Sequence, residues 1–195
     1  MRGDILLTAI IVISSIVLVG CREKDAAPSS PSPSPTQVWD SLGLAGSTLQ
    51  TVAADRRRIF VGTSNGFYRS LDSGRTWLFT GAINGRSSFS SIVISGPNVL
   101  VGTDTNLSIS SNDGATWVLL LAPINVYAMA QGSEFLFAAS SSGVIRSSNN
   151  GLNWTVANNG LPLPLPEVRG FTAEGTTLCL GLANALYISL NNGDS

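Results

Sequence analysis

The amino-acid sequence predicts an all-β fold, a β-propeller built from four-stranded antiparallel sheets that form its blades. Three observations favour this fold: a unit of roughly 40 residues recurs, each unit holds four short strand patterns, and no helical period follows residue 20. One small sheet cannot bury both of its faces, so repeated sheets must stack on one another. About four blades are present, which predicts part of a larger propeller.

The repeat is clearest in a short polar turn. Its copies are SLDSGRTW (70–77), SSNDGATW (110–117), SSNNGLNW (147–154) and SLNNGDS (189–195). Three strand patterns precede each turn, and a fourth follows it, led by a tryptophan in the first three copies. Each pattern is rich in β-branched and aromatic residues and is bounded by Gly, Asn, Ser or Asp, as expected for short strands joined by tight turns.

This turn resembles the Asp-box, or BNR repeat, with the pattern Ser-x-Asp-x-Gly-x-Thr-Trp. The first copy matches it at Ser70, Asp72, Gly74, Thr76 and Trp77, and the later copies carry Asn in place of Asp. The resemblance implies a β-propeller similar to those of sialidases, xyloglucanase-type glycosidases, sortilin-like receptors and photosystem II assembly factors.

We interpret the turn as a structural staple. Asp or Asn accepts hydrogen bonds from nearby backbone N–H groups, Gly adopts positive φ, and Trp anchors the hairpin. Because Asn is a poor general base and a poor ligand for hard metals, the exchange of Asp for Asn argues against a catalytic or calcium site, and neither metal nor cofactor is expected. The predicted structural positions are Ser70, Asp72, Gly74, Trp77, Ser110, Asn112, Gly114, Trp117, Ser147, Asn149, Gly151, Trp154, Ser189, Asn191 and Gly193.

The N-terminal region predicts export and lipidation. A mostly aliphatic, uncharged run at 5–19 ends in Leu-Val-Gly-Cys, which resembles the bacterial lipobox. The resemblance implies a signal peptide at 1–20 and a lipid on Cys21 that anchors the protein to a membrane of the bacterial cell envelope, on the periplasmic side or at the cell surface. A plain signal peptide or an uncleaved anchor is the alternative. Residues 21–37 are rich in Pro and Ser and predict an extended tether before the propeller domain at 38–195.

Composition narrows the function. The chain has no His, 12% charged residues and a net charge of −1, so it lacks the basic surface of a nucleic-acid-binding protein. Without His, Ser-His and Cys-His nucleophilic sites are excluded. Cys179 lies among apolar residues and is predicted to be a small buried hydrophobe, with no disulfide partner once Cys21 carries lipid.

In the enzyme families that this turn resembles, ligands bind at the end of the propeller opposite the turn, so the resemblance implies a candidate ligand face at that end. Its predicted residues are Asn65, Arg86, Asp104, Asn106 and Asn125. A two-carboxylate glycosidase needs acids roughly 5 to 10 Å apart, whereas Asp104 and Glu167 belong to different blades. We therefore expect a binding or assembly scaffold for protein or glycan. The alternative is a fragment of a sialidase-like or xyloglucanase-like glycoside hydrolase whose catalytic residues lie outside this sequence.

Three further segments have two interpretations each. Residues 161–166 alternate Leu and Pro, which predicts an extended loop that packs on its own propeller or presents leucines to a partner. The arginine run 56–58 is interpreted as a solvated turn or as a basic patch. Residues 38–42 resemble the start of a fourth strand, so they either pair with the last unit to close a ring or belong to a longer propeller whose sequence is truncated here.

Overall fold

The structure, a computed structural model, describes residues 47–121 and 124–194. These residues form strands β1 to β15 in four antiparallel sheets, which confirms the all-β prediction. No helix in the described ranges is long and apolar enough to cross a membrane. The predicted signal peptide, the lipidated Cys21, the tether and the strand at 38–42 lie outside the described residues.

Each sheet consists of consecutive strands in the order of the chain. The first sheet holds β1 (Leu49–Asp55), β2 (Arg58–Thr63), β3 (Gly66–Ser70) and β4 (Leu78–Gly81). The second holds β5 (Phe89–Ser95), β6 (Asn98–Thr103), β7 (Leu107–Ser110) and β8 (Val118–Leu121). The third holds β9 (Val126–Gln131), β10 (Leu136–Ser140), β11 (Gly143–Ser147) and β12 (Thr155–Val156), and the fourth holds β13 (Val168–Glu174), β14 (Thr177–Leu182) and β15 (Leu186–Ser189).

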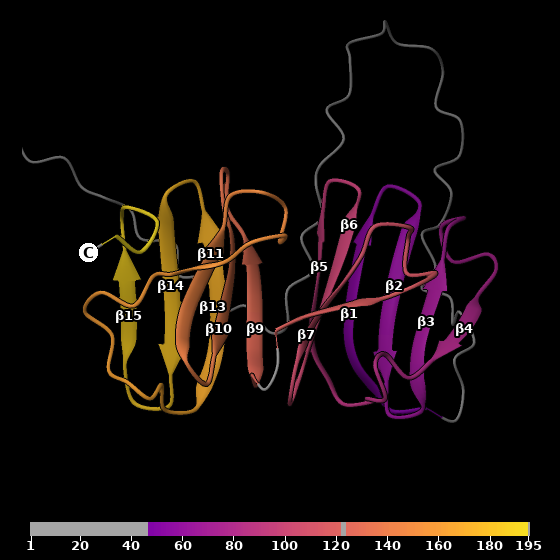
Figure 1. Cartoon of the computed structure of the whole chain (residues 1–195), viewed down its shortest axis with the longest axis horizontal. Coiled ribbons are helices and arrows are strands. Elements are labelled where there is room, and N and C mark those ends of the chain that lie inside the picture. The colour runs from indigo at the N-terminus through magenta and orange to yellow at the C-terminus, as the bar shows by residue number, and fades with distance from the viewer. Residues whose placement is uncertain (1–46, 122–123, 195) are drawn as a thin grey trace, which may run out of the picture.

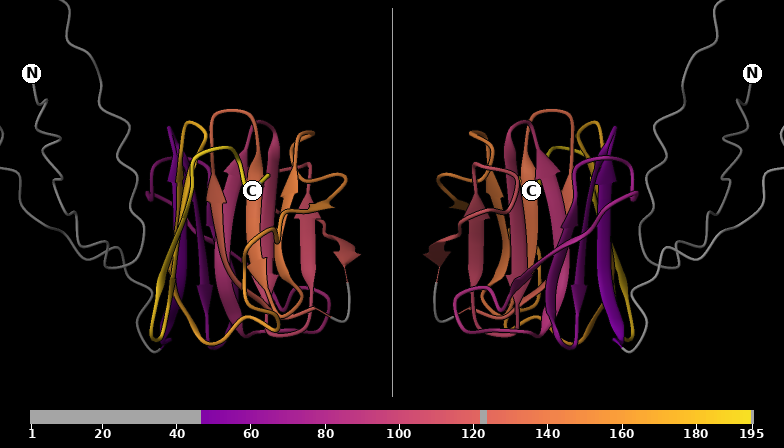
Figure 2. Two further views of the ribbon diagram at one scale, coloured as in Figure 1. Left: turned by 90° about the vertical axis from the view of Figure 1, so that its left-hand side faces the viewer. Right: turned by 90° about the vertical axis from the view of Figure 1, so that its right-hand side faces the viewer.

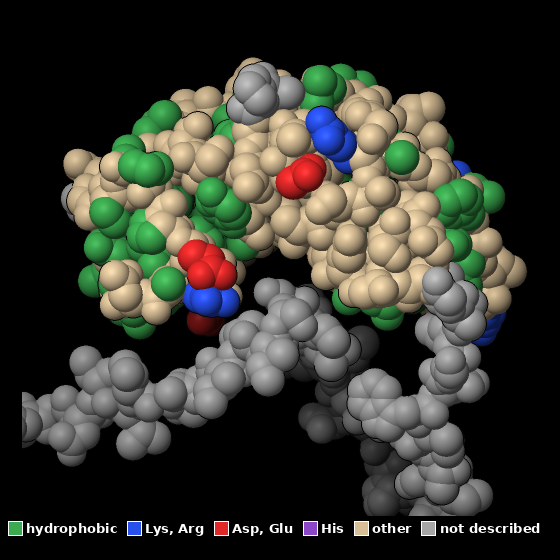
Figure 3. Space-filling view, turned by 90° about the horizontal axis from the view of Figure 1, so that it is seen from below, with side chains coloured by type: hydrophobic (Ala, Val, Ile, Leu, Met, Phe, Trp, Pro, Cys, Tyr) green, Lys and Arg blue, Asp and Glu red, His purple; other side chains and the backbone are tan. Residues whose placement is uncertain are grey.

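The four sheets stack face to face in chain order, as propeller blades do (Figure 1). The first strands β1, β5, β9 and β13 contact one another from sheet to sheet, so they form the inner side of the stack. Seen along the strands, the described body is an arc with a hollow on one side (Figure 3). Figure 2 shows that the turns gather at the two opposite ends of the strands. This is part of a β-propeller.

The hydrophobic core lies between successive sheets. One cluster joins the first and second sheets and includes Phe60, Phe67 and Phe89, and two further clusters occupy the next two gaps. The ring of Phe67 lies 5.7 Å from that of Phe89, in an edge-on arrangement that aromatic pairs favour. Because every cluster has walls from two sheets, each sheet depends on its neighbours for burial.

Two glycines let the sheets approach closely. A Cβ atom on Gly62 would lie 2.7 Å from Cβ of Phe89, and one on Gly102 would lie 2.5 Å from Cγ1 of Val126. In both cases the neighbour belongs to the first strand of the next sheet. The corresponding residue of the fourth sheet is Gly181, where the nearest atoms, from Gly170, are 3.7 Å away. The next sheet therefore leaves no room for a side chain at Gly62 and Gly102, whereas Gly181 has open space beside it.

The Leu-Pro loop and Cys179 differ in how far they are buried. Leu165, in the Leu-Pro loop, is 5% exposed and joins the core between the third and fourth sheets, which confirms that the loop packs on its own propeller. Cys179 is a free thiol that is only half-buried, because it lies on the side of the fourth sheet that no further described sheet covers. The prediction of a buried cysteine was wrong.

The contrast between Gly102 and Gly181 predicts different costs for the same substitution. Gly102→Ala should lower the free energy of unfolding by about 1–3 kcal/mol, because the added methyl group overpacks against Val126. Gly181→Ala is the matched control and should change it far less. Urea denaturation of both variants measures the difference, and equal losses would contradict the packing described here.

Candidate functional site

The first copy of the repeated turn is held by its own side chains. The Ser70 hydroxyl donates to Oδ1 of Asp72 at 2.8 Å and accepts the backbone N–H of Gly74 at 2.8 Å. Asp72 accepts the backbone N–H of Thr76 at 2.9 Å and its hydroxyl at 2.6 Å. Both carboxylate oxygens are thus engaged inside the turn. These bonds hold the pKa of Asp72 at about 2, mainly through the Thr76 hydroxyl and then its N–H.

Asparagine reproduces this geometry in the later copies. In the second copy Asn112 accepts the Ser110 hydroxyl at 2.9 Å and the N–H of Thr116 at 2.9 Å, and its amide donates to the Thr116 hydroxyl. The serine-to-asparagine bond recurs at 2.9 Å in the third and fourth copies. The residue before each central glycine has positive φ; these residues are Ser73 (64°), Asp113 (55°), Asn150 (55°) and Asn192 (59°). The side chain fixes the turn whether it is Asp or Asn.

Each later turn is also bonded to the sheet before it. The Arg69 guanidinium of the first sheet donates to the carbonyl of Asp113 at 2.7 Å, and Arg146 of the third sheet donates to the carbonyl of Asn192 at 2.8 Å. These links were not predicted from the sequence. The available signal was that both arginines stand immediately before the serine of a turn, at the same place in the repeat.

The arginine run contributes a second link between sheets. Arg58, at the start of β2, binds Asp55 at 2.5 Å and reaches Asp113 in the second sheet at 2.9 Å. The hydrogen bond from Arg58 lowers the pKa of Asp55, and the same bond raises the pKa of Arg58. The interpretation of this run as a solvated turn was therefore wrong for Arg58, whose side chain is 21% exposed.

The tryptophan of a turn fills the gap toward the preceding sheet. Trp117, which follows the second turn, packs edge-on against Phe67 of the first sheet with ring centres 5.1 Å apart. A Cβ atom placed on Gly114 would be 3.3 Å from Cζ2 of Trp117, so the central glycine of the turn leaves room for the indole. Trp154 packs against the core between the second and third sheets in the same manner.

The candidate ligand face lies at the other end of the strands, where β14 turns into β15, and Figure 3 shows it as a mostly neutral surface. Asn65, Arg86 and Asp104 are exposed there and Asn125 is half-buried. Asn106 is only 5% exposed, and its side-chain oxygen accepts the hydroxyl of Thr103 at 3.0 Å. Asn106 therefore stabilises its own turn instead of facing the solvent.

Backbone hydrogen bonds hold the turns of this face in place. The N–H groups of Ser64, Ser141 and Ala183 each donate, at 2.9 Å, to the chain that enters the first strand of the same sheet. The acids of this face are dispersed: Asp104 belongs to the second sheet, and Glu167 precedes the fourth and pairs with Arg169 at 2.8 Å. Within the described ranges, no group of three or more acidic, Cys or His side chains could hold a metal ion.

Comparison with known proteins defines the fold class. No family model and no curated protein match the chain. Among solved structures, an ancestral GH74 enzyme is 21% identical with a TM-score of 0.63 over 82% of this chain and 25% of its own. YCF48 bound to D1 peptide is 14% identical with a TM-score of 0.52, covering 75% of this chain and 56% of that one.

A third similar structure comes from the bacterial surface. PorZ, an essential surface component of the type-IX secretion system of Porphyromonas gingivalis, is 17% identical with a TM-score of 0.58 over 76% of this chain and 22% of that one. At these identities the likeness establishes the fold alone, and the chain spans about a quarter to just over half of these proteins. The described residues thus form part of a β-propeller.

Because only Asp titrates, the pH dependence of stability distinguishes Asp72 from an Asn at the same position of the turn. Because its pKa in the folded protein, about 2, lies below the unfolded value of about 3.9, Asp72 stabilises the fold fully above pH 4 and loses this effect as the pH falls toward 2. Asp72→Ala should lower the melting temperature at pH 7 by a few degrees, because the turn loses its acceptor.

Asp72→Asn is the matched variant for this test. It should keep the melting temperature near that of the unchanged protein at pH 7, since Asn112 accepts the corresponding N–H and donates to the hydroxyl that in the first copy donates to Asp72. It should also remove the part of the acid destabilisation between pH 4 and 2 that belongs to this carboxylate. Melting curves over this range measure both effects, and an Asn variant as unstable as the Ala variant would refute the role given to the turn.

Proposed function

We propose that the protein is a lipid-anchored β-propeller of the Asp-box class that works in the bacterial cell envelope as a binding or assembly scaffold for a protein or a glycan. The observation that carries this proposal is that polar side chains are arranged differently at the two ends of the strands. At one end the polar side chains of the repeated turns bind one another, as Asp72 and Thr76 do. At the other end Asn65, Arg86 and Asp104 are exposed on turns fixed by the backbone.

The chemistry of the exposed end suits a neutral polar ligand. Hydroxyl and amide groups donate to and accept from sugar hydroxyls or peptide amides, and fixed turns reduce the entropy lost on binding. Arg86 and Asp104 add one charge of each sign to this surface. The likeness to YCF48 bound to D1 peptide and to the surface component PorZ supports a scaffold, as an analogy between folds.

The alternative is a fragment of a glycoside hydrolase, favoured by the likeness to a GH74 enzyme. Asp104 and Glu167, the acids of the candidate ligand face, belong to different sheets, and Glu167 is already paired with Arg169. Such a hydrolase would take its acid and base from residues other than this pair. Release of reducing sugar from xyloglucan by the protein would favour this alternative over the scaffold.

The scaffold proposal predicts that binding depends on the face opposite the repeated turns. Screening the detergent-solubilised protein on an array of immobilised glycans and extended peptides should give a ligand whose affinity falls about tenfold in Arg86→Ala or Asp104→Ala. Arg75→Ala is the control, since Arg75 is exposed in the first repeated turn. If Arg75→Ala abolished binding while Arg86→Ala and Asp104→Ala retained it, the binding surface would lie at the end with the repeated turns, and the proposal would be wrong.

The anchoring part of the proposal makes a separate prediction. Cys21→Ser should abolish labelling by radioactive palmitate and release the protein from the membrane fraction, because the acyl chains supply the membrane affinity. Cys179→Ser is the matched control and should remain labelled and membrane-bound. Membrane binding of the unchanged protein without any label would show that the apolar run at 5–19 acts as an uncleaved anchor instead.

A further inference from the structure

The first strand of each sheet carries one extra residue near its start. The pairing with the second strand skips this residue, so a β-bulge lies at the same place in all four sheets. The skipped residues are Gln50, Ser90, Tyr127 and Arg169. A bulge residue has no partner on the neighbouring strand, and bulges near functional sites redirect a side chain. Four polar side chains thus occupy corresponding positions on the innermost strands.

The bulge residues lie at the end of the strands that carries the candidate ligand face. The first strand of a sheet ends in a turn beside a repeated turn. In the first sheet the N–H of Ser73 donates to the carbonyl of Arg57 at 2.9 Å, and in the fourth the N–H of Asn192 donates to the carbonyl of Thr176 at 2.8 Å. The start of the strand, with its bulge, is therefore at the opposite end. There the first strands border the hollow that Figure 3 shows.

Hydrogen bonds to the next sheet fix two of these side chains. Oε1 of Gln50 accepts the backbone N–H of Phe89, the residue before Ser90, at 2.9 Å. The Ser90 hydroxyl donates to the carbonyl of Val126, the residue before Tyr127. Gln50, Ser90 and Tyr127 therefore follow one another from sheet to sheet, and we call them the inner row.

Each member of the inner row keeps a polar group that can bind a ligand. The Gln50 amide uses its oxygen in the bond to the next sheet and retains two N–H donors, while Ser90 donates its proton and retains oxygen lone pairs. Tyr127 adds a phenol hydroxyl and an aromatic ring. Gln50 and Ser90 are exposed and Tyr127 is half-buried. The row thus presents donors, acceptors and one ring, and none of the three side chains is charged.

The fourth bulge residue carries a charge that is already balanced. Arg169 pairs with Glu167 at 2.8 Å, and both side chains are exposed. The inner strands therefore add no net charge beside the row, which favours a neutral ligand over a strongly acidic or basic one.

Arg86 stands on a tight turn that is fixed just before β5. In the turn 83–86, Ile83 and Arg86 exchange two backbone hydrogen bonds of 2.9 Å. Ile83 is 1% exposed, and the Asn84 amide donates to the hydroxyl of the fully buried Ser108 at 2.8 Å. A side chain on a turn held in this way needs little further ordering of the backbone when a ligand binds.

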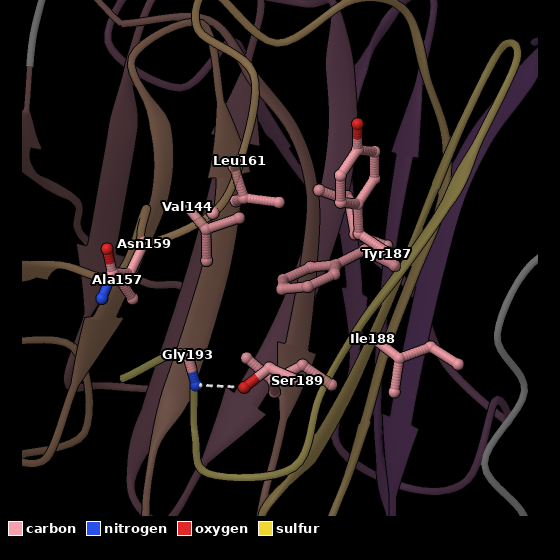
Figure 4. Close-up of a pocket in the computed structure, with 12 residues that line it drawn as sticks. Val144, Ala157, Asn159, Leu161, Tyr187, Ile188, Ser189 and Gly193 are labelled. Atoms are coloured by element: carbon pink, nitrogen blue, oxygen red, sulfur yellow. Dashed lines mark hydrogen bonds between the residues drawn. The ribbon is translucent and has the colours of Figure 1, made fainter. Parts of the chain in front are cut away.

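The serine hydroxyls of the repeated turns, in contrast, are used within the turns themselves. In the fourth turn the Ser189 hydroxyl accepts the N–H of Gly193 at 2.8 Å (Figure 4) and donates to Asn191 at 2.9 Å. Ser70 makes the same two bonds in the first turn. A ligand that binds through hydroxyl and amide groups is therefore better served by the inner row.

The inner edge is less suited to a peptide strand than to a sugar chain. A peptide that adds to a sheet edge pairs with the backbone N–H and C=O groups of that edge. Here the N–H of Phe89 is bonded to Gln50, and the N–H of Met129 donates to the Ser91 hydroxyl at 3.0 Å. The remaining amide, hydroxyl and phenol groups match sugar hydroxyls, which both donate and accept, and the Tyr127 ring offers an apolar face to a sugar ring.

We propose that the inner row binds a neutral oligosaccharide chain. Gln50 and Ser90 bind hydroxyl groups of the chain, one sugar ring stacks on Tyr127, and Arg86 supplies a further donor. The inference rests on the proposed function and narrows its ligand from protein or glycan to glycan. Gln50, Ser90 and Tyr127 were not among the predicted residues of the ligand face, because a bulge leaves no mark in the sequence.

Substitution of Tyr127 tests the proposal. The detergent-solubilised full-length protein is screened on an array of immobilised neutral oligosaccharides, and the dissociation constant of the bound one is measured by isothermal titration calorimetry. Tyr127→Leu should raise this constant by at least about tenfold, because it removes the aromatic face and the hydroxyl. Tyr127→Phe should raise it by only about threefold, because it loses the hydroxyl alone.

Tyr68→Leu is the matched control. Tyr68 lies on β3, two strands from the inner edge, and packs against Phe79 of β4 with ring centres 4.8 Å apart. Its replacement should leave the affinity for the oligosaccharide unchanged. An equal loss of affinity in the two leucine variants, or no loss in Tyr127→Leu, would overturn the proposal.

Hydrogen exchange of the unchanged protein gives a second measurement that does not depend on how the variants fold. The bound oligosaccharide should slow exchange in 49–51, 89–91 and 126–128 and leave the repeated turn 70–77 unaffected. If the arrays yielded only a peptide, bound through Arg86 and Asp104, the oligosaccharide site would be refuted and the scaffold function would stand. If neither a glycan nor a peptide bound, both would be refuted.

Discussion

The stability of this molecule rests on one constraint: a four-stranded sheet has two faces and can bury neither by itself. The core is consequently divided into layers, each with walls from two successive sheets. Sequence features that look unrelated follow from this constraint. Gly62 and Gly102 carry no side chain because the next sheet lies against them, whereas the same position of the fourth sheet, Gly181, has open space.

The repeated turn links each sheet to the sheet before it. Its serine and its Asp or Asn close the turn, which leaves the backbone carbonyl of the residue before the central glycine directed at the preceding sheet. Arg69 and Arg146 donate to these carbonyls, and Asn98 does so in the remaining case, at 3.0 Å. A turn within one hairpin thus joins two sheets, which explains why its polar groups recur.

The repeat allowed most of the fold to be predicted from the sequence, because strand order and turn chemistry are local. The four sheets, the turns and the function of Asp72 in its turn all follow from patterns within about 40 residues. Contacts between sheets depend on how the sheets twist and stack, which no local pattern encodes. For that reason Arg58 was misjudged as solvated and Cys179 as buried. Asn106 was misjudged as part of an exposed ligand face for another reason: its side chain bonds Thr103 within its own turn.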